Sequence, residues 1–266
     1  MIEPDHTGGA PLVRVASWST IPGLTHGFCG RRGGVSQGPL ASLNVSSRVG
    51  DRPEHVAENW RRVERTLPGL TFVRMQQVHG TRTVRVVAPD DQVGEADALI
   101  TDRPGLGLSV LTADCVPLLG VAAAERAVMA VHAGWRGSLA GIAVEALQAA
   151  RQAFGIEVSA WEIALGPSIA GCCYQVETEI GQQFLDRWGA MPDAWQPAGT
   201  HGQLDLRQAN AVVLRQAGVP AGQIHFAGPC TACAGEEFYS HRGAAGRAGR
   251  QVSAIGFSVD APDKAA

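Results

Sequence analysis

Three side chains that can ligate a metal or act in proton transfer lie near the ends of apolar runs. Cys115 follows the run 106–111, His132 ends the run 127–131, and His79 precedes a glycine in the segment 76–80. Each run has the length of a buried strand, so neighbouring strand ends would bring a thiol and an imidazole together. Thiolate and neutral imidazole suit zinc, and also copper, and three protein ligands leave a position open for water or substrate. If they converge, His79, Cys115 and His132 form a catalytic zinc site.

Two other interpretations of the same side chains stay open at this point. Cys115 would be a nucleophile with His132 or His79 as its base, and Asp114 would orient the histidine or carry protons. A zinc-bound thiolate is a poorer nucleophile, so this mechanism and the zinc site largely exclude each other. Alternatively, both histidines are satisfied structural residues and Cys115 is simply buried, as free cysteine often is.

Two glycine-rich, cationic segments are typical of anion binding. The first spans 31–36 and contains Arg32 and Ser36; the second comprises 240–242 and 247–250 and contains Arg242 and Arg250. Glycine lets backbone amides approach an anion, and the arginine fork matches phosphate oxygens. The first segment is no Walker loop, because it lacks the Lys-Ser/Thr ending. On a chain with a net charge of −3, these segments favour a small anionic substrate over nucleic acid.

The remaining cysteines give weaker indications. Cys230 and Cys233 form a CxxC motif, but no second CxxC supports a zinc ribbon, and Gly235 interrupts the helix that a redox motif needs. We therefore expect a structural or incidental role. Cys172 and Cys173 are adjacent, and a disulfide between them would be strained, so two free thiols are predicted.

Composition predicts a cytoplasmic protein. The chain has 266 residues, of which 45% are apolar, with no run of about 18 apolar residues and no basic start or apolar stretch of a signal peptide. Six cysteines are too few for a disulfide-dense secreted scaffold, so reduced thiols are expected. The near-neutral charge predicts no nucleic-acid or membrane partner.

Periodicity and turn residues predict a single α/β domain over 1–266, with flexible ends at 1–10 and 260–266. No repeat or long linker divides it. Helices are predicted over 53–67, 138–154, 177–188 and 205–217. Strands are predicted over 13–18, 83–87, 106–111, 116–121, 127–131, 161–165, 224–227 and 251–258.

Several motifs resemble the YfiH family, also known as multicopper polyphenol oxidoreductase (laccase)-like proteins and as peptidoglycan editing factors. The matching stretches span nearly the whole chain in order, and the TADC and HAGWRG segments are the most specific. They are RGGVS at 32–36, SLN at 42–44, QVHG at 77–80, ADA at 96–98, TADC at 112–115, HAGWRG at 132–137, GPSI at 166–169, FYSHR at 238–242 and GR at 249–250.

This resemblance implies a single-domain layered sandwich with mixed β-sheets, related to cysteine-hydrolase-like deamidases. The family's metal ligands fall on His79, Cys115 and His132. The implied activity is zinc-dependent purine nucleoside phosphorolysis: adenosine, inosine or methylthioadenosine reacts with phosphate to give the free base and the sugar 1-phosphate. The resemblance also implies adenosine deaminase activity and a monomer or weak homodimer.

The other expected roles follow from the implied phosphorolysis. Asp114 would carry a proton or orient a ligand, and the expected contacts to phosphate, ribose or base come from Arg32, Ser36, Asn44, Gln77, Arg242 and Arg250. The alternatives are a cysteine-type amide hydrolase that edits peptidoglycan precursors and a copper-dependent polyphenol oxidase. Copper fits less well, because a multicopper oxidase needs many histidines and this chain has eight, with no His-x-His pair.

Overall fold

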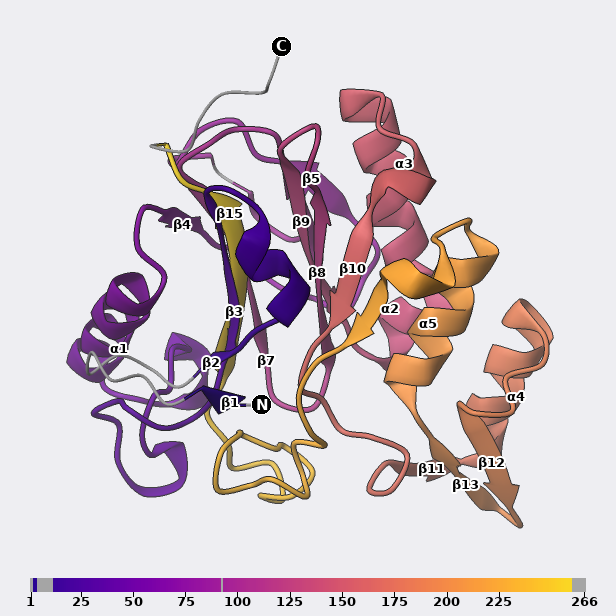
Figure 1. The fold of residues 1–266 in the computed structure, drawn as a ribbon. Helices are drawn as coiled ribbons and strands as arrows, with labels where there is room; N and C mark the ends of the chain where they lie inside the picture. Colours follow the sequence, from indigo (N-terminus) through magenta and orange to yellow (C-terminus); the bar gives the residue numbers. More distant parts are fainter. Residues whose placement is uncertain (1, 4–11, 92, 260–266) are drawn as a thin grey trace.

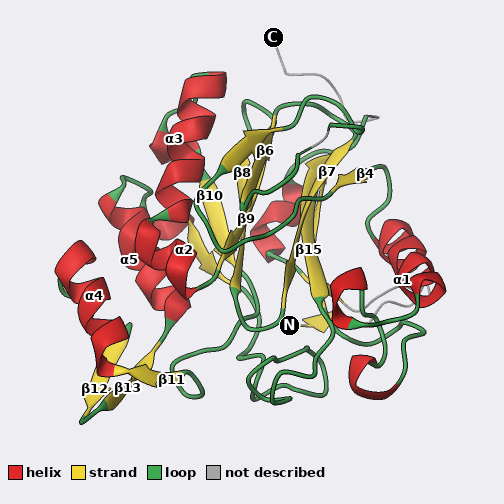
Figure 2. Ribbon diagram, turned by 180° about the vertical axis from the view of Figure 1, so that it is seen from behind, coloured by secondary structure: helices red, strands yellow, loops and turns green. Residues whose placement is uncertain are grey.

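The computed structural model describes residues 2–3, 12–91 and 93–259 and shows a layered α/β sandwich. Two six-stranded sheets face each other (Figures 1 and 2). The outer face of one is covered by helices α2 (Trp135–Ala140), α3 (Ile142–Phe154) and α5 (Leu206–Gln216), and helix α1 (Pro53–Thr66) lies beyond the other. Both large sheets mix parallel and antiparallel pairs. The mixed-sheet α/β fold expected from the sequence is therefore confirmed.

The first sheet has the strand order β1-β2-β3-β15-β7-β4. All its pairs are antiparallel except β4 with β7. Its strands are β1 (Ile2–Glu3), β2 (Leu12–Val13), β3 (Leu24–Cys29), β15 (Gln251–Phe257), β7 (Leu106–Thr112) and β4 (Thr71–Val73).

The second sheet has the order β14-β10-β8-β9-β6-β5 and is parallel only at its two edges, β14 with β10 and β5 with β6. Its strands are β14 (Ile224–Phe226), β10 (Glu162–Leu165), β8 (Val116–Ala122), β9 (Ala127–Ala133), β6 (Ala98–Thr101) and β5 (Thr83–Arg85). A small antiparallel sheet joins β11 (Gln175–Glu177), β13 (His201–Leu204) and β12 (Trp195–Ala198).

The helices bury apolar faces against these sheets. The α-helices are α1 (Pro53–Thr66), α2 (Trp135–Ala140), α3 (Ile142–Phe154), α4 (Thr178–Trp188) and α5 (Leu206–Gln216). Short 3₁₀ helices span Ala16–Thr20, Gly38–Leu40, Ser47–Val49, Val158–Ala160 and Ala221–Gln223. In α1, Val56, Trp60 and Val63 pack with Val252 and Ala254 of β15.

Strand β8 shows why its sequence is apolar throughout. Leu118 joins the core under the helices, whereas Leu119 and Val121 join the core between the two sheets. A strand buried on both faces needs no polar alternation. Strand β8 is buried along its whole length and begins directly after Cys115.

Two predicted elements were wrong. The helix predicted over 138–154 is two helices, because Gly141 adopts φ +89° and separates α2, which begins at Trp135, from α3. The strand predicted over 13–18 ends at Val13, and 16–20 form a 3₁₀ helix that buries Trp18. Of the ends expected to be flexible, only Ile2 and Glu3 are described, and they pair with β2; the other residues of 1–10 and 260–266 lie outside the described residues. Among the described helices, none combines the length and apolarity needed to cross a membrane.

Candidate metal centre

The fold brings His79, Cys115 and His132 together from three segments. Cys115 lies between β7 and β8, and His132 lies near the end of β9, opposite Pro117 of β8. Because β8 and β9 are antiparallel neighbours, the start of one meets the end of the other. His79 comes from the connection between β4 and β5 and has φ +63°.

The three ligand atoms lie within 4.8 Å of one another. Cys115 Sγ is 3.8 Å from His79 Nε2, and the two imidazole rings are 4.7 Å apart, edge to face. For zinc bonds of about 2.0–2.3 Å in tetrahedral geometry, ligand atoms lie roughly 3.3–3.8 Å apart. The donor set and its spacing therefore fit a zinc ion with small adjustments.

Asp97, which is fully buried at the start of β6, organises two of these side chains. Its Oδ1 accepts hydrogen bonds from His132 Nδ1 (2.8 Å) and the His79 amide (3.0 Å), and its Oδ2 accepts from the amides of Val78 (3.2 Å) and Gly80 (2.7 Å). The first bond fixes the tautomer of His132 and leaves Nε2 with a lone pair for a metal. The amide bonds hold His79 in its left-handed conformation.

Cys115 and His132 shift each other's ionisation. Burial raises the pKa of the Cys115 thiol, but the adjacent His132 and His79 outweigh it, and the net pKa falls to about 6. Burial lowers the pKa of His132, but the Cys115 thiolate and Asp97 raise it to about 9. The pair therefore favours a thiolate facing an imidazolium, and a metal cation would take the place of the imidazolium proton.

Gly134 leaves room for the three side chains. A Cβ at this position would lie 2.7 Å from His79 Cδ2 and 3.2 Å from Cys115 Sγ. The glycine between His132 and Trp135 is thus required by the close approach of the backbone to the centre.

Asp114 is tied to its surroundings rather than free in the centre. It has φ +90°, its Oδ1 accepts from Thr231 Oγ1 (2.7 Å), and its Oδ2 accepts from the Arg242 amide (2.7 Å). Of the two roles expected for Asp114, this bonding favours the orienting one, because both oxygens hold the loop that ends in Cys115.

A cleft of about 930 Å³ opens at the centre. This volume lies in the upper part of the range of small-molecule sites. Its described lining comprises residues 45–49, 72–77, 79, 89–91, 93–94, 111–115, 132, 174, 241–242 and 250.

Three of the predicted substrate contacts line this cleft. Arg242 stacks on Tyr174, 5.1 Å from the ring centre, and Arg250 donates to the carbonyls of Ala248 and Gly249. The Gln77 side-chain amide pairs with the backbone of Leu111, donating to its carbonyl and accepting from its N–H, both at 2.8 Å. Gln77 therefore positions the His79 segment against β7.

The other three predicted contacts lie away from the described lining of the cleft. Arg32 donates to the Glu236 carbonyl at the surface. Ser36 and Asn44 are buried, and both donate to Asp51, at 2.6 and 2.8 Å. Their polar groups hold loop backbone together, so the expectation that they contact substrate is not supported by their placement.

Sequence reasoning missed several residues of the centre. Arg48, Arg74 and Tyr174 line the cleft. Burial raises the pKa of Tyr174 to about 12, helped by the Cys115 charge, so its hydroxyl stays protonated at neutral pH. Asp97 carried a recognisable signal, an acid directly before the apolar run that becomes β6.

Fold and site together define an α/β sandwich protein with a His-Cys-His centre. The chain belongs to the family described as multi-copper polyphenol oxidoreductase laccase, whose model matches residues 25–258. The resemblance to YfiH proteins is confirmed: the crystal structure of the hypothetical protein YfiH from Bacillus licheniformis superposes with a TM-score of 0.86 at 30% identity, covering 94% of this chain and 97% of that one.

Other relatives carry an activity in their names. The protein named purine nucleoside phosphorylase from Deinococcus radiodurans is 37% identical over 254 residues, 93% of either chain. The purine nucleoside phosphorylase YlmD from Geobacillus stearothermophilus is 35% identical over 248 residues, 88% of this chain and 90% of the relative. The crystal structure of YlmD from that organism has a TM-score of 0.88 and covers 97% of this chain and 98% of that one, at 32% identity.

Proposed function

We propose that this protein is a zinc-dependent purine nucleoside phosphorylase whose metal ligands are His79, Cys115 and His132. The observation that carries the proposal is the convergence of these side chains on one cleft, in a chain that is 37% identical to a protein named purine nucleoside phosphorylase. The volume of about 930 Å³ is large enough for a nucleoside together with phosphate.

The side chains of the centre support zinc. One thiolate and two imidazoles are ligands that zinc accepts, and the bond from His132 to Asp97 is the outer-shell contact usual for a metal-bound histidine. When bound, zinc would supply a Lewis acid that polarises an oxygen and stabilises developing negative charge.

The chain's own residues account for the other requirements of phosphorolysis. A phosphate oxygen forms a bond to C1′ of the sugar while the bond from C1′ to the base nitrogen breaks, and its electron pair leaves with the base. Arg242 and Arg250 line the cleft and would hold the phosphate by charge-assisted hydrogen bonds. The protonated hydroxyl of Tyr174 can donate a hydrogen bond to substrate in the same cleft.

Adenosine deamination is the second activity proposed for this centre. Zinc sites with one open position activate water for attack on a purine carbon. An amide hydrolase with Cys115 as nucleophile is the alternative that the lowered thiol pKa favours. A multicopper oxidase fits poorly, since the described residues contain one group of histidine ligands, and it comprises two histidines and one cysteine.

The test uses purified, metal-analysed protein with inosine or adenosine, with and without phosphate. We expect phosphate-dependent release of hypoxanthine or adenine, together with ribose 1-phosphate. The activity and about one equivalent of zinc should be lost in His79→Ala and Cys115→Ala, and both should persist in His201→Ala, a matched change of another exposed histidine.

The outcomes separate the candidates. Inosine formed from adenosine without phosphate would establish deamination. Activity on amides that survives chelation and is lost on alkylation of Cys115 would refute the phosphorylase in favour of the hydrolase. A cytoplasmic location and a monomeric or weakly dimeric state stay predictions.

A further inference from the structure

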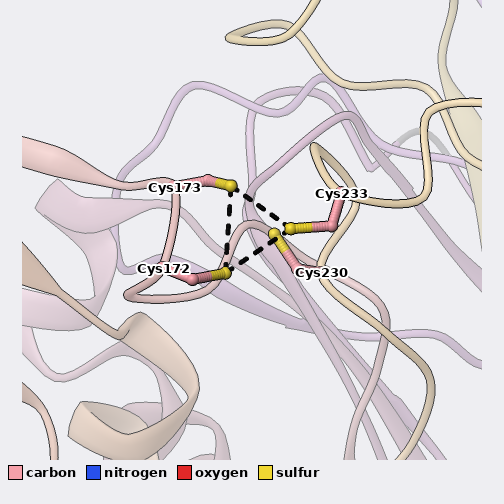
Figure 3. A group of neighbouring side chains, drawn as sticks. All are labelled: Cys172, Cys173, Cys230 and Cys233. Atoms are coloured by element: carbon pink, nitrogen blue, oxygen red, sulfur yellow. Dashed lines mark hydrogen bonds between the residues drawn. The ribbon is translucent and has the colours of Figure 1, made fainter.

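Two cysteine pairs far apart in the sequence meet on the surface beside the cleft. Cys172 and Cys173 lie in the turn before β11, and Cys230 and Cys233 lie in the turn after β14. Figure 3 shows the four side chains of these turns pointing toward one another. The partner that the CxxC motif lacked in the sequence is therefore the adjacent pair about sixty residues upstream.

The sulfur atoms have the spacing of a metal site. Cys233 Sγ is 3.6 Å from Cys172 Sγ and 3.4 Å from Cys173 Sγ, and Cys172 and Cys173 are 3.8 Å apart. All four sulfurs lie within 4.8 Å of one another. A tetrahedron of zinc–sulfur bonds of about 2.3 Å has edges of about 3.8 Å, whereas bonded sulfurs lie about 2.05 Å apart. All four cysteines are free thiols.

The backbone around Cys230 is arranged to stabilise a thiolate. The Ala170 amide donates to Cys230 Sγ at 3.4 Å, and the amides of Ala232 and Cys233 also donate to this sulfur. Amide donors directed at one sulfur indicate an anionic ligand rather than an inert buried thiol.

We propose that Cys172, Cys173, Cys230 and Cys233 bind a zinc ion in a closed tetrathiolate site, separate from the His-Cys-His centre. Four sulfur ligands fill the tetrahedron and leave no position for water, which is typical of structural rather than catalytic zinc. Binding replaces the thiol protons and joins the two turns.

The location of the tetrathiolate site indicates what the ion would stabilise. Thr231, between two of the ligands, donates to Asp114 through its hydroxyl and to the Ser168 carbonyl through its amide, at 2.7 and 3.0 Å. The amide of Ile169 donates to the Asp114 carbonyl at 3.0 Å. Both turns therefore hold the loop that ends in Cys115, and zinc between them would fix that loop from outside the cleft.

The test counts zinc in a protein that lacks the first site. We expect about one zinc per chain in Cys115→Ala. We expect no zinc in the triple variant that combines Cys115→Ala with Cys172→Ala and Cys233→Ala. Adding Cys29→Ala instead is the matched control, because Cys29 is a free cysteine outside both groups, and the zinc should remain. If the His-Cys-His centre bound no zinc at all, the Cys115→Ala protein would still carry one zinc that the variant lacking Cys172 and Cys233 loses.

Two measurements on the protein with all its cysteines guard against variants that fail to fold. Native mass spectrometry should show two zinc ions per chain, and cobalt substitution should give thiolate charge-transfer bands that persist in Cys115→Ala. A Cys115→Ala protein that is folded and reduced but binds no zinc would overturn the proposal. Intact masses showing a native disulfide among the four cysteines would overturn it as well.

Discussion

Replacing Asp97 by asparagine tests whether this carboxylate holds the metal centre. Asp97 is fully buried and accepts four hydrogen bonds, from His132 Nδ1 and from the amides of Val78, His79 and Gly80. Asparagine has one oxygen and one NH₂ group. In either orientation, two of the four donors therefore face another donor.

The bonding pattern sets the expected magnitude. If the NH₂ group replaces Oδ1, His132 and His79 lose their acceptor; if it replaces Oδ2, Val78 and Gly80 do. Leaving a buried donor unsatisfied costs about 1–3 kcal/mol. Because the three amide donors are only partly buried, water offsets part of their loss, and we expect a total of about 1–3 kcal/mol of unfolding free energy. Loss of the outer-shell bond to a metal-bound histidine typically lowers metal affinity about 10–100-fold.

The assay compares zinc affinity, by competition with a chromogenic chelator, and urea unfolding of the chelated protein. The matched control is Asp102→Asn, because Asp102 makes surface ion pairs with Arg85 and Arg103. Such pairs contribute about 0–1 kcal/mol. Wild-type zinc affinity and stability in Asp97→Asn would refute the role assigned to this carboxylate.

Three further predictions concern backbone space, ionisation and helix capping. Gly134→Ala should lower zinc affinity at least about tenfold, because the added Cβ would lie 2.7 Å from the His79 ring. Gly222→Ala, where the added Cβ meets open space, should leave zinc affinity unchanged. Equal zinc affinities in the two variants would show that the centre adjusts freely to the extra carbon. In chelated protein, the rate of alkylation of Cys115, followed by peptide mapping, should be half-maximal near pH 6. The rate should decrease further at lower pH, because the reactive thiolate becomes protonated. A midpoint above pH 8 contradicts the thiolate–imidazolium pair. Asp205→Ala should cost about 1–2 kcal/mol in urea unfolding, since Asp205 caps α5 through the amides at 207 and 208; an unchanged midpoint would mean that water replaces the cap.

Many elements could be predicted because their signals are local. Pro53 and the helical spacing of Val56, Trp60 and Val63 predicted α1, and the Asp205 cap predicted α5. The break at Gly141 could not be predicted in this way, because an isolated glycine is tolerated within a helix. In the structure Gly141 ends α2 in a left-handed conformation, and a Cβ there would lie 3.0 Å from the ring of Trp188 in α4.

The sequence by itself determined the types of metal ligand and the apolar runs that carry them. His79, Cys115 and His132 were predicted as a set, with the family resemblance supporting the choice. Their distances depended on β8 and β9 being antiparallel neighbours, which residue types do not reveal. Tertiary structure alone placed Ser36 and Asn44 in a buried network on Asp51, although their motifs pointed to substrate.

For the other cysteines too, the sequence determined the ligand type and the tertiary structure decided the site. The sequence supplied two pairs of thiols about sixty residues apart, and neither pair by itself indicates a metal site. Only the tertiary structure brought Cys172 and Cys173 to Cys230 and Cys233, because the turns that carry them are joined by the bridge between Ser168 and Cys230. Ligand chemistry is a property of residue type and can be recognised along the chain, whereas a coordination site is a set of distances that long-range strand and turn pairing decides.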